Sequence, residues 1–296
     1  MENNLLNIFF VLDKNYIVPF TVTLTSILEN NKDLEIQAFV LHELGHNDTL
    51  ELACKFFKDK YNIEIASISF EDKYFNDFHI AEHITKAGYF KLLLGQMIPE
   101  SVSCGLYIDC DIAVTGSLKE FCTLDFYDDA KGEETPLCAV TDVRATKEIT
   151  RLNKAGANLV SYFNTGVFFA NLKKWRADNA AEKMIAIGQQ YDKNLVYVDQ
   201  DVMNVYFKTN YKELNDKYNA DAAVKHVQLP VILHYHGISK PWHFVDNSPY
   251  KHIYRKYLKM TPFKNVKQQG ISLENFARKY VRWFRQKLNP VPDYTI

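Results

Sequence analysis

Two aspartates that flank a single residue at the end of an apolar run are the first side chains in this sequence whose spacing suits chemistry. Asp109 and Asp111 lie on either side of Cys110, directly after the run 106–108. On an extended backbone, residues two apart face the same side, so these carboxylates repel each other unless a cation lies between them. Hard oxygen ligands suit Mg²⁺ or Mn²⁺, ions that commonly hold a diphosphate. The pair is therefore a candidate metal site, although an acidic turn after a strand has the same pattern.

A second polar cluster begins within the apolar run 229–235 and continues beyond it. His234 can complete a metal site that two carboxylates begin, and Lys240 supplies a point charge for phosphate. Gly237, between them, lets the backbone approach a ligand closely. Each of these residues also has an ordinary structural use, as a buried imidazole, a turn glycine or a surface lysine. It is their clustering that favours a ligand site.

Two further segments place polar groups inside or beside elements that are otherwise apolar. Asn164, Thr165 and Gly166 interrupt an apolar strand. A glycine at such a place marks close approach of a ligand or of another backbone, or else a β-bulge. The stretch 199–201, Asp-Gln-Asp, opens a helix, where aspartate also serves as a cap. Both segments are thus candidates for a site and for a structural role.

The elements that must position these groups are those of an α/β fold. Short runs rich in Ile, Val and Phe alternate with amphipathic stretches, which indicates a mainly parallel sheet flanked by helices. The strands are expected at 5–12, 34–41, 63–69, 104–109, 136–141, 163–171 and 229–235. The helices are expected at 17–30, 47–60, 83–95, 171–190 and 199–208. Ligands of such sheets bind beyond the carboxyl ends of the strands, where several of these polar groups fall.

Taken together, the motifs resemble those of glycosyltransferase family 8, which includes bacterial lipopolysaccharide galactosyl- and glucosyltransferases and glycogenin. They occur in the family's order and at about its spacing over residues 5–245. The matching segments are Phe10–Tyr16, Tyr107–Asp111, Phe163–Gly166, Asp199–Asp201 and His234–Trp242. The resemblance implies a GT-A-type, Rossmann-like mixed sheet flanked by helices in a catalytic domain over residues 1–245. It also implies a retaining hexosyltransferase that takes galactose or glucose from a UDP-sugar with Mn²⁺, or Mg²⁺ in its place.

The resemblance also assigns roles to single residues of this sequence. The implied metal ligands are Asp109, Asp111 and His234. The implied contacts to the nucleotide sugar are Asp13, Asn15, His83, Lys91, Cys110, Asn164, Gly237 and Lys240. The implied catalytic residues, close to the transferred sugar, are Asp142, Asp199 and Gln200. One position departs from the family, because Lys91 stands where an arginine is more common, and a lysine cannot form the bidentate contact of a guanidinium.

The chemistry of the bond suggests how such a site would act. Cleavage at the anomeric carbon develops positive charge on the sugar and negative charge on the diphosphate, so a metal and Lys240 at the leaving group would stabilise the transition state. Retention needs either a covalent intermediate or attack from the face that the leaving group vacates. Gln200 is a poor nucleophile, which favours same-face attack, with Asp199 as the alternative nucleophile.

Composition leads us to expect a protein of the cytoplasm. The 296 residues include five cysteines without a Cys-x-x-Cys pair, and no apolar window reaches the roughly 18 residues of a membrane span. The start of the chain lacks the features of a signal peptide. Residues 251–287 hold eleven Lys or Arg and one acid, which leaves 24 basic and 35 acidic residues elsewhere. The net charge of −1 therefore conceals two oppositely charged regions.

The basic region belongs to the expected C-terminal extension, residues 246–296, which is basic, rich in aromatic residues and predicted to be helical. Within 271–288, aromatic and aliphatic residues recur at helical spacing among basic ones, a pattern that suits an anionic membrane surface. Packing of this stripe on the catalytic domain is the alternative, and binding of nucleic acid is not favoured because the rest of the chain is acidic. We therefore expect peripheral attachment to the inner face of the cytoplasmic membrane and a saccharide acceptor such as lipopolysaccharide or another lipid-linked glycan.

Two other functions compete with sugar transfer. A phosphohydrolase of the haloacid-dehalogenase type also has Asp-x-Asp at a strand end, but Ala113 stands where that family has Thr or Val, and the motif comes mid-chain. A non-catalytic member would bind a nucleotide sugar or a membrane without transfer. Self-glucosylation in the manner of glycogenin also stays open.

Overall fold

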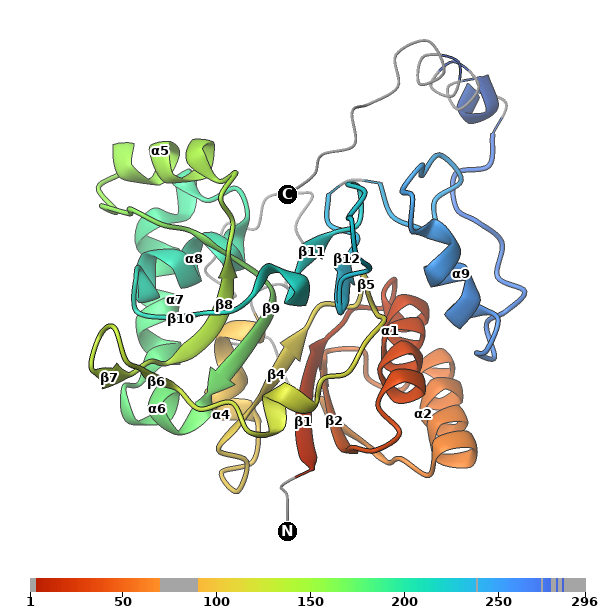
Figure 1. The fold of residues 1–296 in the computed structure, drawn as a ribbon, viewed down its shortest axis with the longest axis horizontal. Helices are drawn as coiled ribbons and strands as arrows, with labels where there is room; N and C mark the ends of the chain where they lie inside the picture. The colour runs from red at the N-terminus through yellow and green to blue at the C-terminus, as the bar shows by residue number, and fades with distance from the viewer. Residues whose placement is uncertain are drawn as a thin grey trace.

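A mixed sheet with strand order β10-β8-β9-β4-β1-β2-β3 forms the centre of the molecule (Figure 1). The structure is a computed structural model that describes residues 4–69, 90–237, 239–272, 274–277, 281 and 284. β9 runs antiparallel to β4 and β8, whereas the other pairs in the sheet are parallel. The strands are β1 Leu5–Val11, β2 Glu35–His42, β3 Ile65–Ser69, β4 Cys104–Ile108, β8 Leu137–Thr141, β9 Phe163–Asn171 and β10 Lys212–Glu213.

Helices cover both faces of this sheet because its central strands are apolar on both sides. In β1, Ile8 and Phe10 face a core shared with α1 (Ile17–Asn30) and α2 (Asp48–Tyr61). Phe9 and Val11 face the opposite core, which is shared with α6, α7 and α8. These helices span Leu172–Ala177, Ala180–Tyr191 and Val198–Phe207. Figure 1 shows the two groups of helices on opposite sides of the sheet.

A smaller sheet lies beside the main one and was not expected from the sequence. It has the order β11-β12-β5, with β11 at Ala220–Asp221, β12 at Ile232–His234 and β5 at Ile112–Val114. β12 pairs antiparallel with β5, so that His234 lies opposite Ile112. The predicted strand 229–235 is thus shorter than expected and lies outside the main sheet. Its pairing brings His234 next to the end of β4.

The pairing of β8 with β9 is irregular at one point. Ala139 pairs with Phe168, but the next paired position joins Thr141 to Phe163. The residues of β9 between these positions have no ladder partner on β8. They include the Asn-Thr-Gly segment, so the bulge that the sequence left open as an alternative is present there.

The expected helices are confirmed in part. α1, α2 and α8 lie where the sequence predicts them, but the single helix expected at 171–190 is wrong. Asn179 adopts a left-handed conformation with φ +49° and separates α6 from α7. The helix expected at 83–95 falls mostly outside the described residues, and its end appears as the short helices η1 (Lys91–Leu93) and α4 (Leu94–Met97).

Several short elements and one longer helix lie outside the predicted elements. That helix is α5 (Thr146–Lys154), whereas α9 (Lys251–Leu258) lies within the C-terminal extension that the sequence predicts to be helical. The short elements are η2 Lys119–Cys122, β6 Tyr127–Asp128, β7 Glu133–Glu134, η3 Asp192–Asn194 and η4 Asp216–Tyr218.

The C-terminal extension begins in contact with the catalytic domain. α9 packs through Tyr254 and Tyr257 into a core cluster that includes Val22 of α1. The Tyr257 hydroxyl accepts a hydrogen bond from the Asn30 side chain at 2.7 Å. Most of the helix expected at 271–288 lies outside the described residues, and the boundary at 245 stays a prediction. None of the helices in the described ranges is long and apolar enough to cross a membrane.

One buried hydroxyl joins α1 to the segment that follows β4. Thr23 Oγ1 lies 2.7 Å from the carbonyl oxygens of both Cys110 and Ile112. Val114 N–H, a little further along, donates to Ser26 Oγ at 2.9 Å. α1 thus holds in place the backbone segment that carries the two candidate aspartates and leads into β5.

We predict that Thr23→Val lowers the free energy of unfolding by about 1–3 kcal/mol, because two buried carbonyls lose a shared donor. Urea denaturation followed by circular dichroism measures this. Thr21→Val is the matched control, since Thr21 is equally buried and its Oγ1 donates to the Ile17 carbonyl within the same helix, at 2.8 Å. An equal loss in both variants would contradict the proposed tie.

Candidate functional site

The antiparallel direction of β9 explains why the polar segments meet. The carboxyl ends of β1, β4 and β8 lie at one edge of the sheet, and the start of β9 lies at the same edge because this strand runs the other way. Asp13 follows β1, Asp109 follows β4 and Asp142 follows β8, and Asn164 belongs to the start of β9. Asp109 N–H donates to the Gly166 carbonyl at 2.8 Å, which joins two of these ends directly.

The three expected metal ligands form one cluster. A ligand atom from each of Asp109, Asp111 and His234 lies within 4.8 Å of the other two. His234 Nε2 is 3.4 Å from Asp111 Oδ1, and Tyr235 N–H donates to the Asp111 carbonyl at 2.9 Å. Both Asp111 and His234 are buried. The register of β12 against β5 is what brings them together.

Lys240 lies on the other side of the same carboxylate. Its Nζ is 2.5 Å from Asp111 Oδ2 and 2.9 Å from the Tyr235 carbonyl. Burial alone would raise the pKa of Asp111, but the charges of Lys240 and His234 outweigh it and hold that pKa below its ordinary value. Asp111 is therefore an ionised carboxylate in spite of its burial.

Lys91 is a buried cation between two of the expected site acids. Its Nζ lies 2.7 Å from Asp199 Oδ2 and 3.3 Å from Asp109 Oδ1, and its side chain is 5% exposed. It also lies 4.8 Å from the centre of the Tyr107 ring, whose hydroxyl donates to Asp109 at 2.7 Å. Burial lowers the pKa of Lys91, but the charges of Asp109 and Asp199 raise it above its usual range, so the amine stays protonated.

The start of β9 is tied to α8 through side chains. Gln200 Oε1 accepts hydrogen bonds from Asn164 Nδ2 and from Thr165 N–H, both at 3.1 Å. The Thr165 hydroxyl donates to Asp199 Oδ2 at 3.1 Å. Asn204, one turn further along α8, pairs with both the N–H and the carbonyl of Phe163. These bonds fix the two expected catalytic side chains of α8 over the bulge in β9.

Gly166 is required by the imidazole of His234. A Cβ at this position would lie 2.2 Å from His234 Cε1 and 2.8 Å from Nδ1, closer than any real contact. The glycine therefore marks close approach of another side chain, as well as lying in a bulge. Gly237 serves a different purpose, since its φ of +90° is one that other residues rarely adopt.

The loop after β1 meets the last motif through aromatic rings. The Tyr16 ring contacts the Trp242 ring edge to face, with centroids 5.8 Å apart. Burial, together with the charges of Asp111 and Asp109, raises the pKa of Tyr16. Asn15 N–H donates to Asp13 Oδ1 at 2.7 Å, which closes a turn at the end of β1. Asp13 and Asn15 thus lie in the loop next to the acid pair, and the hydrogen bond between them closes the turn without involving Asp109 or Asp111.

The side chains of Cys110 and Asp142 do not belong to the acid cluster. Cys110 is buried and its Sγ lies 3.6 Å from the Val11 carbonyl, so only its backbone could reach a ligand. Asp142 accepts a hydrogen bond from Arg144 N–H at 3.0 Å in the turn after β8. His83 lies outside the described residues.

Asp201, the last residue of the Asp-Gln-Asp motif, has a structural role. Its carboxylate is fully buried and accepts two hydrogen bonds from Arg151 Nη2, at 2.8 and 2.9 Å. The Tyr162 hydroxyl and the N–H groups of Val196 and Tyr197 donate to it as well. Charge pairing and five hydrogen bonds explain how an acid can occupy this position.

Sequence reasoning missed polar residues that have no motif around them. Arg144 Nη1 lies 2.7 Å from Asp221 Oδ2, and Asp221 Oδ1 lies 3.4 Å from His236 Nε2. Asn219, just before β11, contacts both Asn164 and His234. Arg144, Asn219 and Asp221 come from segments without a strong apolar pattern, so no local signal could have found them. His236 belongs to the motif at 234–242, but it was not chosen as a site residue.

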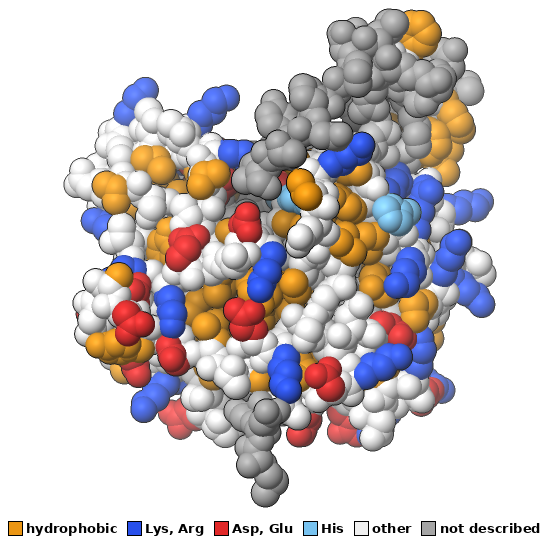
Figure 2. Space-filling model, in the orientation of Figure 1, with side chains coloured by type: hydrophobic (Ala, Val, Ile, Leu, Met, Phe, Trp, Pro, Cys, Tyr) orange, Lys and Arg blue, Asp and Glu red, His pale blue; other side chains and the backbone are white. Residues whose placement is uncertain are grey.

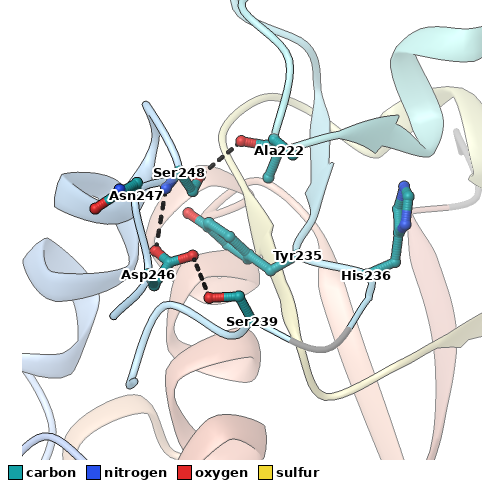
Figure 3. A pocket seen from close by; sticks show the side chains of 8 residues that line it. Ala222, Tyr235, His236, Ser239, Asp246, Asn247 and Ser248 are labelled. Atoms are coloured by element: carbon teal, nitrogen blue, oxygen red, sulfur yellow. Dashed lines mark hydrogen bonds between the residues drawn. The ribbon is translucent and has the colours of Figure 1, made fainter. Parts of the chain in front are cut away.

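A pocket of about 320 Å³ borders the loop that carries Lys240 (Figure 3). Asp246 lies between Ser239 and Ser248, accepting from the hydroxyl of the first and the N–H of the second at 3.3 Å each. Figure 3 shows His236 turned to the other side of this loop, away from Asp246. The pocket thus combines polar and apolar side chains and lies beside the segment that follows His234.

The cluster fits a divalent cation by its donor chemistry. Two carboxylates and an imidazole converge, and one carboxylate is ionised although it is buried. Oxygen and imidazole donors together suit Mn²⁺ and tolerate Mg²⁺. The residues that would hold the ion are the three that the sequence predicted.

Fold and site together define a GT-A-type α/β protein. The chain belongs to glycosyl transferase family 8, whose sequence model matches residues 7–246. This confirms the resemblance that the motifs indicated, and it favours sugar transfer over the phosphohydrolase alternative.

Individual relatives agree with this assignment. The chain is 27% identical to a lipopolysaccharide 1,2-glucosyltransferase of Escherichia coli, over 97% of this chain and 88% of the relative. It is 26% identical to a lipopolysaccharide 1,3-galactosyltransferase of Salmonella typhimurium, over 80% and 73% of the two chains. The solved structure of the galactosyltransferase LgtC with donor and acceptor sugar analogues superposes with a TM-score of 0.75 at 22% identity, over 93% of this chain and 100% of that one. This last likeness shows the fold.

Proposed function

We propose that this protein is a retaining transferase that moves galactose or glucose from a UDP-sugar to a saccharide acceptor with the help of Mn²⁺ or Mg²⁺. The observation that carries the proposal is the cluster of Asp109, Asp111 and His234, with Lys240 paired to Asp111. A cation with a lysine beside it is the arrangement that a departing diphosphate needs. Family membership supports sugar transfer itself.

Each side chain then has a task. A divalent cation bound there would supply Lewis-acid stabilisation of the diphosphate. Lys240 adds a positive charge at the same leaving group. Asp13 and Asn15, in the loop after β1, are proposed to bind the uridine, and Gly237 the diphosphate. His83, Lys91, Cys110 and Asn164 are proposed to complete the donor site, as the family motifs imply.

Same-face attack is the mechanism we favour for retention. Asp199, the alternative nucleophile, already shares its Oδ2 between Lys91 and the Thr165 hydroxyl. An ammonium group at 2.7 Å reduces the nucleophilicity of a carboxylate. Gln200 is fixed by two donors and is proposed to stabilise the positive charge of the sugar without attacking it. Asp142 is proposed to contact the transferred sugar.

The acceptor is proposed to be a lipid-linked glycan at the inner face of the membrane. The lipopolysaccharide transferases among the relatives support this class. Arg255 and Lys256 of α9 are exposed, and Figure 2 shows basic side chains on the side of the view where Figure 1 places α2 and α9. Phe276 and Phe284 are each about half exposed, at 53% and 52%. Basic and apolar groups together suit an anionic lipid surface.

Nucleotide release without acceptor is the first test. We expect slow UDP release from one UDP-hexose in the presence of Mn²⁺, and none with EDTA. Asp111→Asn should slow this release at least about a hundredfold, because the leaving group loses its metal. Asp48→Asn, at an exposed position, should behave as wild type. Equal release with EDTA would disprove the metal-dependent route.

Substitutions on α8 test the mechanism of retention. With an acceptor present, Asp199→Asn should keep transfer within about tenfold, whereas Gln200→Ala should lose about 10²–10³-fold as an electrostatic contact disappears. Initial rates of product formation measure both. The opposite pattern, with Asp199 essential and Gln200 dispensable, would support a covalent intermediate instead.

Vesicle binding tests the C-terminal extension. Deletion of residues 271–296 should abolish sedimentation with phosphatidylglycerol vesicles while the remaining chain stays folded, because the aromatic and basic surface is removed. Phosphatidylcholine vesicles are the control and should bind neither form. Undiminished sedimentation of the shortened chain would refute this role.

A further inference from the structure

A chain of side-chain amides runs from α8 to the imidazole of His234. Asn164 Oδ1 accepts from Asn219 Nδ2 at 2.9 Å, and Asn219 Oδ1 lies 2.9 Å from His234 Nδ1. At its other end, Asn164 Nδ2 donates to Gln200 Oε1 at 3.1 Å. The chain thus connects a proposed catalytic residue with a proposed metal ligand.

Two backbone N–H groups fix the direction of every bond in this chain. Gly166 N–H donates to Asn164 Oδ1 at 2.9 Å, and Thr165 N–H donates to Gln200 Oε1 at 3.1 Å. A backbone N–H can only donate, so the oxygens of both amides must face the bulge in β9. With Asn164 Oδ1 fixed as an acceptor, Asn219 must turn its NH₂ toward it.

The oxygen of Asn219 is then the group that faces His234. An amide oxygen can only accept, so Nδ1 of the imidazole must carry a proton. Nε2 is left as the ring nitrogen that can coordinate a cation, and it is the nitrogen near Asp111. Gly166 keeps the ring in place from the other side, because no larger residue fits against it.

We propose that Asn219 is a positioning residue that sets the tautomer of His234 for metal binding and links the metal site to Gln200. This inference rests on the proposed function, since it concerns the metal that the transferase would use. Partners of this kind orient metal-binding histidines and affect the affinity for the metal. Asn219 thereby connects the Asn-Thr-Gly motif with the motif that begins at His234, although the two are far apart in the sequence.

The segment around Asn219 is held in place by other contacts, so its side chain can be changed without loss of the fold. Asn219 N–H donates to the Asp216 carbonyl at 3.0 Å, and Ala222 N–H donates to the His234 carbonyl at 2.9 Å. Tyr218 is buried, with its ring centroid 4.8 Å from that of Phe121. Replacement of Asn219 therefore removes the amide and leaves these anchors.

The tautomer can be read without metal. Two-bond ¹H–¹⁵N spectra of the full-length protein should show His234 protonated at Nδ1, with its signals assigned by their loss in His234→Gln. In Asn219→Ala the Nε2-protonated form should appear. A wild-type imidazole protonated at Nε2 alone, or an unchanged tautomer in Asn219→Ala, would overturn the proposal.

Metal binding provides the second measurement, by the electron paramagnetic resonance signal of free Mn²⁺. Asn219→Ala should bind Mn²⁺ at least about tenfold more weakly than wild type. Asn219→Asp keeps an acceptor for Nδ1–H, so its affinity for Mn²⁺ should stay near that of wild type. Its kcat should nevertheless fall, because a carboxylate oxygen would then face Asn164 Oδ1, where two acceptors repel each other. The Asn164 and Gln200 amides cannot flip to relieve this repulsion, since the N–H groups of Gly166 and Thr165 hold their oxygens in place.

Asn215→Ala is the matched control. Asn215 accepts from Lys217 N–H at the start of η4, the short helix that Asn219 follows, and it does not belong to the chain of amides. It should bind Mn²⁺ as wild type does. Equal Mn²⁺ affinity in Asn219→Ala and wild type would overturn the role of Asn219 but not the proposed metal site. Failure of the wild type to bind Mn²⁺ would instead overturn the metal in the proposed function, and the tautomer measurement would still test Asn219.

Discussion

Repulsion among three acids is the constraint on which this site depends. Asp109, Asp111 and Asp199 come from two different elements and converge in a partly buried region, where charges interact more strongly than in water. Lys91 is shared between Asp109 and Asp199, and Lys240 is paired with Asp111. Because Lys91 and Asp199, like Lys240 and Asp111, are far apart in the sequence, the fold must be complete before the charges are balanced. The site and the tertiary structure therefore depend on each other.

The direction of one strand determines which groups can meet. β9 brings its first residues, instead of its last, to the edge where β1, β4 and β8 end. The polar segment at its start then reaches α8 on one side and His234 on the other. A parallel β9 would carry the same residues to the opposite edge. The mixed character of the sheet is thus a requirement of the site as well as a feature of the fold.

Much of this arrangement could be predicted from local patterns. Apolar runs locate the strands of the main sheet, and the joint occurrence of five motifs indicates the family. What local patterns cannot give is pairing between distant segments. The second sheet and the partners of Lys91 both depend on contacts between residues far apart in the chain. Asn219 carried no signal at all, because a single asparagine after a short helix looks like any turn residue.

The irregular pairing of β8 with β9 also changes which face the strand presents. Between the two paired positions β9 advances five residues, from Phe168 to Phe163, while β8 advances two. Side chains five apart on a regular strand face opposite sides, yet Phe163 and Phe168 belong to the same core cluster. The three surplus residues thus reset the alternation, and they allow both flanks to keep their apolar faces inward. The length of this bulge therefore concerns the core as well as the site, since Phe163 and Phe168 on its two sides pack into the same cluster.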